Sequence, residues 1–354
     1  MPAASLSRVL AAQRRGRAAV LALAGICGST GCRSPWQDLF HVQSAGARLP
    51  VIAYGPSDAS TVVLFQHGGP DGAAGIDPLP PGLANLTEEA LVVTWAQRST
   101  GLASGISRTR DNTIAQHVAD LHAVRQAMTS RYAGTRRLVL AGHSWGVSLT
   151  LAYLDTYGEA DVAGLVLTDG FDAFGNNAER SFMRLAELAS ERADDTTGED
   201  ADFWREVEDF ALDEGTSGAP YATETIMEAS SACARIEQEL DRPEPVESAL
   251  PALGTVTSPL VVPDGLLVSW NLRTMFEDLT AFDQSASVED RRLPALLVWG
   301  ESDCRVPVAT GESILARYGG DATMVVVEGA THFAIYSQPR AFAEPTLAFL
   351  EALP

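Results

Sequence analysis

The stretch Leu138-Val139-Leu140-Ala141-Gly142-His143-Ser144-Trp145-Gly146 decides the fold. Its first four residues form a short, continuous apolar run, which is typical of a strand buried on both faces. Residues 145–157, which follow, have the character of a helix. A serine between Gly142 and Gly146, at a turn from a buried strand into a helix, fits the pattern G-x-S-x-G. That turn is so tight that larger side chains would clash, so we expect Ser144 to be held on a strained turn.

Further apolar runs on both sides of this stretch predict a mainly parallel sheet. These predicted strands are 62–65, 91–95, 164–168, 295–299 and 324–327. Apolar residues at helical spacing predict a helix from about residue 114, with Asp111 or Thr113 as its N-cap, and a last helix over 341–353. Residues 39–43 and 51–54 flank a turn and predict a hairpin. Buried strands that alternate with helices indicate an α/β fold with helices on both faces of the sheet.

Two residues further along the chain form a candidate catalytic set with Ser144. Asp303 follows the predicted strand 295–299, and His332 follows the strand 324–327. Loops at the carboxyl ends of parallel strands collect functional groups in such a sheet. Serine, acid and histidine in this order are also the order that accompanies G-x-S-x-G. His332 would take the proton of Ser144, and Asp303 would hold the imidazole during covalent acyl transfer. This chemistry needs no metal or organic cofactor.

Several alternatives to this set remain open. Ser144 fits an ordinary turn serine as well, and Asp303 fits the N-cap of the next helix, which would leave Asp169 or Glu301 as the acid. His143 is interpreted as a residue that positions the turn. The other histidines are assigned to the hairpin, to the loop after residue 66 and to one helix; they are His41, His67, His117 and His122. The last two are five residues apart, which is not a metal-ligand spacing.

Three motifs resemble one known family. His67-Gly68-Gly69-Pro70 matches the HGGP oxyanion loop of the proline iminopeptidase branch of the α/β-hydrolase superfamily. Gln97-Arg98, with Gly101 and Ser104, matches part of that branch's DQRG-x-G-x-S loop, and Ser144-Trp145-Gly146 matches its SWG elbow. The resemblance covers about residues 39–353. Ala96 stands where that loop has Asp, and Asp71 stands where HGGP is followed by Gly.

The resemblance implies an α/β-hydrolase fold and a serine hydrolase that cleaves an ester or amide bond. The backbone N–H groups of Trp145 and Gly69 would form the oxyanion hole. The implied substrate is a short peptide with a free, prolyl N-terminus, but the family's amine-binding glutamates cannot be placed in this chain. A carboxylesterase or lipase-like enzyme for small acyl esters is the alternative, and a non-catalytic sensor of small ligands is a further one. Arg98 is interpreted as structural, tying its loop through a carboxylate to a helical cap expected at residues 171–290.

Acidic charge is concentrated in one segment. The chain of 354 residues has a net charge of −21, and its 25 basic residues are all arginine. A chain without lysine cannot form a lysine Schiff base or a Walker A site, and an acidic chain is a poor partner for nucleic acid. Residues 171–290 contain 27 acidic residues and seven Arg, a net charge of −20. This segment interrupts the alternation of strands and helices, so we expect it to be an inserted helical cap.

The expected organisation is an export signal at 1–32, a core in two parts at 33–170 and 291–354, and the acidic cap at 171–290. Within the cap, Phe203, Trp204 and Phe210 alternate with carboxylates, as in amphipathic helices. Its charge has two interpretations. In the first, the carboxylates of the cap attract the ammonium group of a peptide substrate. In the second, they form a solvated surface, and this interpretation is favoured because most of these residues must lie on outer faces.

The N-terminus has the features of an export signal. Arg14-Arg15-Gly16-Arg17 precedes the apolar run 18–26, which is too short to span a bilayer. Small residues and Cys32 follow, so we expect a periplasmic or cell-envelope lipoprotein lipidated at Cys32, or a secreted protein. Any membrane attachment would be through this anchor alone. Cys233 and Cys304 would then pair in an oxidising compartment or remain two separate buried thiols, and separate thiols are favoured.

Overall fold

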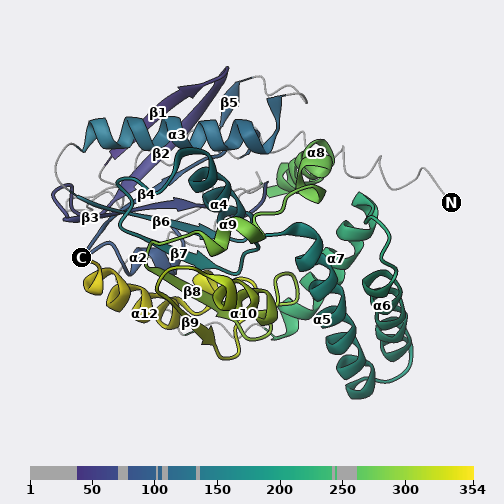
Figure 1. The fold of residues 1–354 in the computed structure, drawn as a ribbon. Coiled ribbons are helices and arrows are strands. Elements are labelled where there is room, and N and C mark those ends of the chain that lie inside the picture. The colour runs from purple at the N-terminus through teal and green to yellow at the C-terminus, as the bar shows by residue number, and fades with distance from the viewer. Residues whose placement is uncertain are drawn as a thin grey trace, which may run out of the picture.

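A computed structural model describes residues 38–70, 79–100, 103–105, 111–132, 136–240, 244 and 261–354, with only the backbone for 261–270. In these ranges the strands form one sheet of nine, in the order β1-β2-β4-β3-β6-β7-β8-β9, with β5 paired to β2 (Figure 1). The strands are β1 (Asp38–Ser44), β2 (Ala47–Tyr54), β3 (Thr61–Gln66), β4 (Leu91–Trp95), β5 (Ser104–Gly105), β6 (Arg137–His143), β7 (Gly164–Thr168), β8 (Ala295–Gly300) and β9 (Ala322–Val327).

The helices alternate with the parallel strands except between β7 and β8. They are α2 (Pro81–Ala84), α3 (Ile114–Arg131), α4 (Trp145–Tyr157), α5 (Phe174–Asp195), α6 (Glu199–Thr216), α7 (Thr223–Leu240), α8 (Val261–Thr280), α9 (Ser285–Glu289), α10 (Val308–Arg317), α11 (Ala334–Ser337) and α12 (Pro339–Ala352). Thr113, rather than Asp111, caps α3, because its side chain accepts the N–H of Gln116 at 3.2 Å.

Strands β3, β4 and β6 to β9 are parallel, and the hairpin β1–β2 is antiparallel at one edge. The central strands are buried along their whole length, because helices cover both faces of the sheet. On β3, Leu64 packs in the core that includes α3, α4 and α10, whereas Val63 packs in the core that includes α2, α11 and α12. The predicted α/β fold with helices on both faces is thus confirmed.

A long helical segment leaves the sheet after β7 and returns before β8. Its two ends lie side by side: Phe174 N–H donates to Phe282 O at 3.0 Å, and Gln284 N–H donates to Asp172 O at 2.7 Å. Between these points α5, α6 and α7 project together from the sheet on the side away from the C-terminus (Figure 1). They share a core of their own, which includes Phe182 and Trp204.

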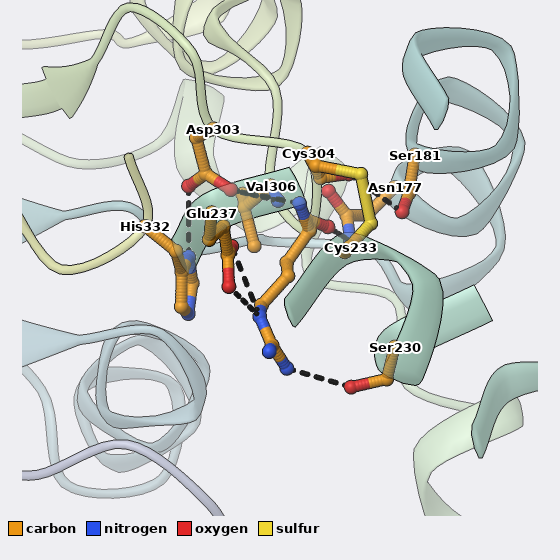
Figure 2. The surroundings of a disulfide bond; sticks show 10 residues. Asn177, Ser181, Ser230, Cys233, Glu237, Asp303, Cys304, Val306 and His332 are labelled. Atoms are coloured by element: carbon orange, nitrogen blue, oxygen red, sulfur yellow. Dashed lines mark hydrogen bonds and ion pairs between the residues drawn. A yellow bond between two sulfur atoms is a disulfide. The ribbon is translucent and has the colours of Figure 1, made fainter. Parts of the chain in front are cut away.

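This helical core also contains a residue of the sheet layer. Cys304, in the loop after β8, forms a disulfide with Cys233 on α7 (Figure 2). The interpretation of two separate thiols is therefore wrong. The cause lies in the packing, since α7 lies against the loop after β8 and brings the two Cα atoms to 5.6 Å, which lies within the disulfide range.

The N-terminal segment, including Cys32, lies outside the described residues, as do Asp71 and Gly101. Among the helices that are described, none is long and apolar enough to cross a membrane.

Candidate active site

Ser144 occupies the turn between β6 and α4, with φ 56° and ψ −125°. A positive φ is unusual for a residue with a side chain. The two flanking glycines are required by close backbone contacts. A Cβ on Gly146 would overlap with the carbonyl oxygen of Gln66 on β3, and a Cβ on Gly142 would overlap with the carbonyl oxygen of Gly146. The tight turn expected from G-x-S-x-G is thus present, and Ser144 is the N-cap residue of α4.

Asp303 and His332 are in direct contact. His332 Nδ1 lies 2.8 Å from Asp303 Oδ2, and both side chains are buried. The other oxygen of Asp303 accepts the backbone N–H groups of Arg305 at 2.8 Å and Val306 at 2.9 Å. These contacts close a turn in the loop, whereas the N-cap of α10 is Pro307, so Asp303 does not cap that helix. Burial lowers the pKa of His332 to about 3, which keeps the ring neutral at pH 7.

His143 joins the Ser144 turn to the His332 loop. Its Nε2–H donates to the backbone oxygen of His332 at 2.7 Å, and the two rings are 4.9 Å apart between centroids. Burial lowers the pKa of His143 to about 3, so this ring is also neutral. Because His143 precedes Ser144 in the chain, this bond ties the Ser144 turn to the loop that carries His332.

The glycine-rich loop after β3 lies against the same turn. A Cβ on Gly68 would lie 3.1 Å from the Cβ of Ser144. Gly69 has φ 140°, a conformation that suits glycine, and the peptide bond to Pro70 is cis. The backbone N–H of Trp145 is at the first position of α4, where a helix leaves its N–H groups without intrahelical partners. Both expected oxyanion donors therefore lie in segments that border Ser144.

Gln97 connects this loop to the turn. Its side chain accepts from Trp145 Nε1 at 2.9 Å and donates to His67 O at 2.9 Å. Its backbone N–H donates to His67 Nε2 at 3.2 Å, so the proton of that ring is on Nδ1, which donates to Gly68 O at 2.7 Å. Burial lowers the pKa of His67 to about 4 and keeps it neutral.

Arg98 is structural, but its partner differs from the expected one. Its guanidinium donates to both oxygens of Asp120 on α3, at 2.6 and 2.7 Å, and both side chains are fully buried. The expected tie to the cap is therefore wrong, because Asp120 on α3 of the core lies directly beside the loop. The cap contacts this loop through Asn271 on α8, which donates to Ser99 O at 3.1 Å.

The cap supports the loop that carries Asp303 (Figure 2). Glu237 on α7 is buried and forms an ion pair with Arg305, whose Nε lies 3.1 and 3.0 Å from the two carboxylate oxygens. Burial raises the pKa of Glu237, and Arg305 opposes that rise. Arg305 also donates to Ser230 at 2.6 Å, and Ser181 on α5 donates to Cys304 O at 2.9 Å.

Glu237 and Arg305 were not assigned a place in this site from sequence, and no local motif marks them, because their contact joins segments far apart in the chain. His143 was interpreted as positioning the turn, but its bond to His332 was not expected. Of the two alternative acids, Glu301 accepts the N–H of Gly329 at 2.9 Å, and Asp169 is buried beside Asp303.

The remaining histidines lie apart from Asp303. His117 is buried and bonds to Asn112 at 3.2 Å, and His122 stacks on Tyr157 with centroids 3.8 Å apart. Within the described ranges, no group of three histidine, cysteine or acidic side chains is placed to hold a metal ion.

Comparison with known proteins identifies the family of this chain. A profile of the alpha/beta hydrolase family matches residues 62–344. A proline iminopeptidase from Neisseria gonorrhoeae is 37% identical over 105 residues, which are 30% of this chain and 31% of that protein. The match therefore spans about a third of the length of that relative.

Solved structures support the same fold. A proline iminopeptidase-related protein from Thermus thermophilus has a TM-score of 0.61 and 22% identity, over 89% of this chain and 98% of that one. An esterase from Rhodococcus sp. ECU1013 has a TM-score of 0.54 and 19% identity, over 89% of this chain and 99% of that one. With the profile match over most of its length, the chain belongs to the alpha/beta hydrolase family.

Proposed function

We propose that the protein is a serine hydrolase that cleaves an ester or amide bond with Ser144, His332 and Asp303 as its catalytic triad. The bond from His332 Nδ1 to Asp303 is the observation that carries this proposal. Because the carboxylate holds the proton on Nδ1, the neutral ring has its lone pair on Nε2, where it can accept the proton of a serine hydroxyl.

In the proposed mechanism, Ser144 attacks the carbonyl carbon of the substrate while His332 takes its proton. Asp303 stabilises the imidazolium that forms. The N–H groups of Trp145 and Gly69 bind the oxyanion, and loss of one such donor typically costs about 2.7–4 kcal/mol of transition-state stabilisation. The imidazolium then protonates the leaving group, and water, activated by the same ring, hydrolyses the acyl-enzyme and frees Ser144.

The first candidate substrate is a short peptide with a free N-terminus, as the local likeness to proline iminopeptidases suggests. A small acyl ester is the second. The ion pair favours the second candidate, since Glu237, a buried cap carboxylate beside the triad, already binds Arg305 with both oxygens and is not free for a substrate ammonium group.

A paired substrate panel separates these candidates. The wild-type protein and Ser144→Ala would be assayed on aminoacyl-arylamides, prolyl ones included, and on p-nitrophenyl esters of short acids. We expect hydrolysis in one or both series, and a loss of about 10⁴- to 10⁶-fold in kcat in Ser144→Ala. Activity on esters alone would end the peptidase proposal. No activity in either series, with a folded protein that binds these compounds, would favour the ligand sensor.

We also propose that the protein is exported and that Cys32 is lipidated. The basic and apolar N-terminal pattern supports export, and the disulfide between Cys233 and Cys304 adds to it, because such bonds persist in oxidising compartments. Mass spectrometry of the mature N-terminus, from cells in which the full chain is expressed, tests both. A diacylglyceryl Cys32 is the expected result, and an intact Met1 would contradict export.

A further inference from the structure

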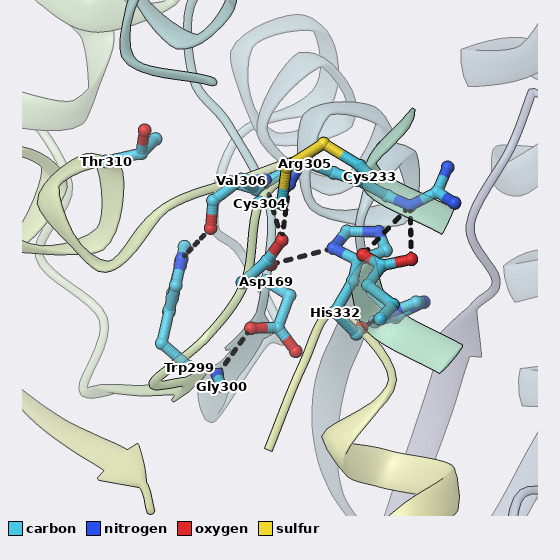
Figure 3. A network of polar contacts seen from close by, with 12 residues as sticks. Asp169, Cys233, Trp299, Gly300, Cys304, Arg305, Val306, Thr310 and His332 are labelled. Carbon is cyan, nitrogen blue, oxygen red and sulfur yellow. Dashed lines mark hydrogen bonds and ion pairs between the residues drawn. A yellow bond between two sulfur atoms is a disulfide. The ribbon is translucent and has the colours of Figure 1, made fainter. Parts of the chain in front are cut away.

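Asp169 directly follows β7 and points its side chain toward the neighbouring strand β8. Its Oδ1 accepts the backbone N–H of Gly300 at 2.8 Å, and the residue is fully buried (Figure 3). Its backbone has φ 47°, in the left-handed region that asparagine and aspartate tolerate better than other residues with side chains. The fold therefore holds this carboxyl group at the carboxyl ends of the strands, beside Asp303.

The two neighbouring carboxyl groups are unequally supplied with hydrogen-bond donors. Asp303 accepts from the N–H groups of Arg305 and Val306 and from His332 Nδ1. Asp169 accepts one N–H, and its buried Oδ2 has no partner within the described part of the chain. Donors stabilise an ionised carboxylate, and two buried carboxyls side by side do not both ionise readily. A proton shared by this pair therefore belongs on Asp169.

The surrounding charges agree with this assignment. Glu237 adds a negative charge from α7, which Arg305 balances, while burial keeps His332 and His143 neutral. A second ionised carboxylate next to Asp303 would leave two uncompensated charges in a buried site. Accordingly, burial raises the pKa of both carboxyl groups: that of Asp303 only to about 7, because the N–H groups of Val306 and Arg305 oppose the rise, and that of Asp169 well above its ordinary range, where the charge of Asp303 raises it further.

We propose that Asp169 is a positioning residue of the triad, which stays protonated at neutral pH and uses its carboxyl O–H to orient the Asp303 carboxylate toward His332. This role rests on the proposed function of the triad. The protonation state, however, can be tested without any substrate.

The test follows from the linkage between protons and folding. In the folded protein Asp169 keeps its proton, whereas in the unfolded chain it ionises above its ordinary pKa of about 3.9. Unfolding then releases one proton, so this group makes the folded state less favourable as pH rises, until the pH reaches its raised pKa. Asp169→Asn keeps the acceptor for Gly300, offers an amide donor in place of the O–H, and has no proton to lose.

Urea unfolding of the full, disulfide-bonded chain between pH 5 and 8 measures this effect. We expect the folding equilibrium constant of Asp169→Asn, divided by that of the wild type, to rise about tenfold per pH unit. The matched control is Asp172→Asn. Asp172 is also buried, but Arg317 pairs with it at 2.6 Å, so its ratio should be flat. A flat ratio for Asp169→Asn would show that Asp169 is ionised in the folded protein. This result would overturn the proposal, whether or not Ser144 is the nucleophile.

Kinetics test the positioning role. We expect kcat of Asp169→Ala to fall roughly ten- to a hundredfold, as for loss of a hydrogen bond to a charged group, with little change in KM. Asp169→Asn should recover part of this loss because its amide donates to Asp303. Equal losses in both variants, or none in Asp169→Ala, would overturn the role. If Ser144 proved not to be the nucleophile while the pH-dependent ratio still rose, the proposed function alone would fail.

Discussion

At Ser144, the chain holds a residue with a side chain in a backbone conformation that usually belongs to glycine. The glycines on either side make this possible, because the backbone of β3 and the first turn of α4 pass within contact of their α-carbons. The strained conformation of the half-buried Ser144 is thus made possible by neighbours that have no Cβ atoms.

Gly146→Ala tests this account of the turn. Its Cβ would overlap with the carbonyl oxygen of Gln66 on a buried strand that cannot move freely. We expect a loss of about 3 kcal/mol or more in the free energy of unfolding, measured with urea. The control is Gly175→Ala, at an exposed position of α5 with nothing within 4 Å of the new Cβ, which should be neutral or slightly stabilising. Equal effects of the two substitutions would refute the steric argument.

Asp303→Asn tests the acid of the triad. The amide oxygen can still accept the N–H groups of Arg305 and Val306, so the loop should keep its shape. The variant loses the negative charge and favours the wrong tautomer of His332. The same change of the triad acid in a serine protease lowers kcat by about 10⁴-fold, and we expect a loss of that order. Activity within tenfold of the wild type, with unchanged circular dichroism, would argue against Asp303.

Sequence was informative at this scale only where the chemistry is local. Ser144, with its two glycines, is a contiguous pattern. Asp303 follows the buried strand β8, and His332 follows the apolar run of the edge strand β9, so all three could be selected. The role of Glu237 could not be predicted from the sequence, because its partner Arg305 is 68 residues away on a different element. Asp169 could be named as an alternative acid, but its position beside Asp303 depends on the pairing of β7 with β8.

At the scale of elements, α7 and the loop after β8 form one unit. Cys233, Ser230 and Glu237 lie on one helix, and they bind Cys304 and Arg305, the two residues that follow Asp303. The cap therefore contributes to the support of Asp303, the proposed catalytic acid.

Cys233→Ser tests this support. The disulfide joins residues 71 positions apart, and loop-closure entropy assigns a bond of that span about 4 kcal/mol of stability. We expect a loss of that order in the free energy of unfolding, with reduced kcat. Reductant should produce the same change in the wild type and none in Cys233→Ser. If reductant left the stability of the wild type unchanged, the disulfide would not form in solution.

The elements themselves were largely predictable, because a buried parallel strand is a short run of apolar residues. The strands expected at 91–95 and 164–168 have those bounds in the structure, and the helix 145–157 does too. The pairing of Cys233 with Cys304 was not predictable from the sequence, since it depends on how α7 lies against the sheet layer. The same holds for Arg98, whose carboxylate partner could not be chosen among many acidic residues.

For the whole molecule, the question is what the acidic cap does. The carboxylates of α6 mostly face solvent, while Ala201, Trp204, Val207 and Ala211 on its other face are buried. This distribution is that of an amphipathic surface helix and supports the interpretation of a solvated surface. Composition alone located the charge in this segment, but the orientation of each carboxylate needed the packing of α5, α6 and α7.

Neutralising exposed carboxylates of α6 tests this interpretation. We expect the triple variant Glu199→Gln, Glu206→Gln, Asp213→Asn to keep kcat/KM within about twofold for both a cationic aminoacyl ester and a neutral ester at 0.1 M salt, because solvated charges are screened over about 10 Å under that condition. The opposite result would be a severalfold lower kcat/KM of the variant for the cationic ester alone. If high salt lowered the kcat/KM of the wild type for this ester to the same value, the cap would be shown to attract cationic substrates.

The most direct test of the central claim is labelling of the folded, full-length protein with a fluorophosphonate, followed by peptide mapping. Such probes react with serines that a neighbouring histidine activates. The account predicts a single adduct on Ser144, absent from Ser144→Ala and from urea-unfolded protein. Failure of the folded wild type to react, or equal labelling of Ser144→Ala, would contradict the assignment of Ser144 as the nucleophile.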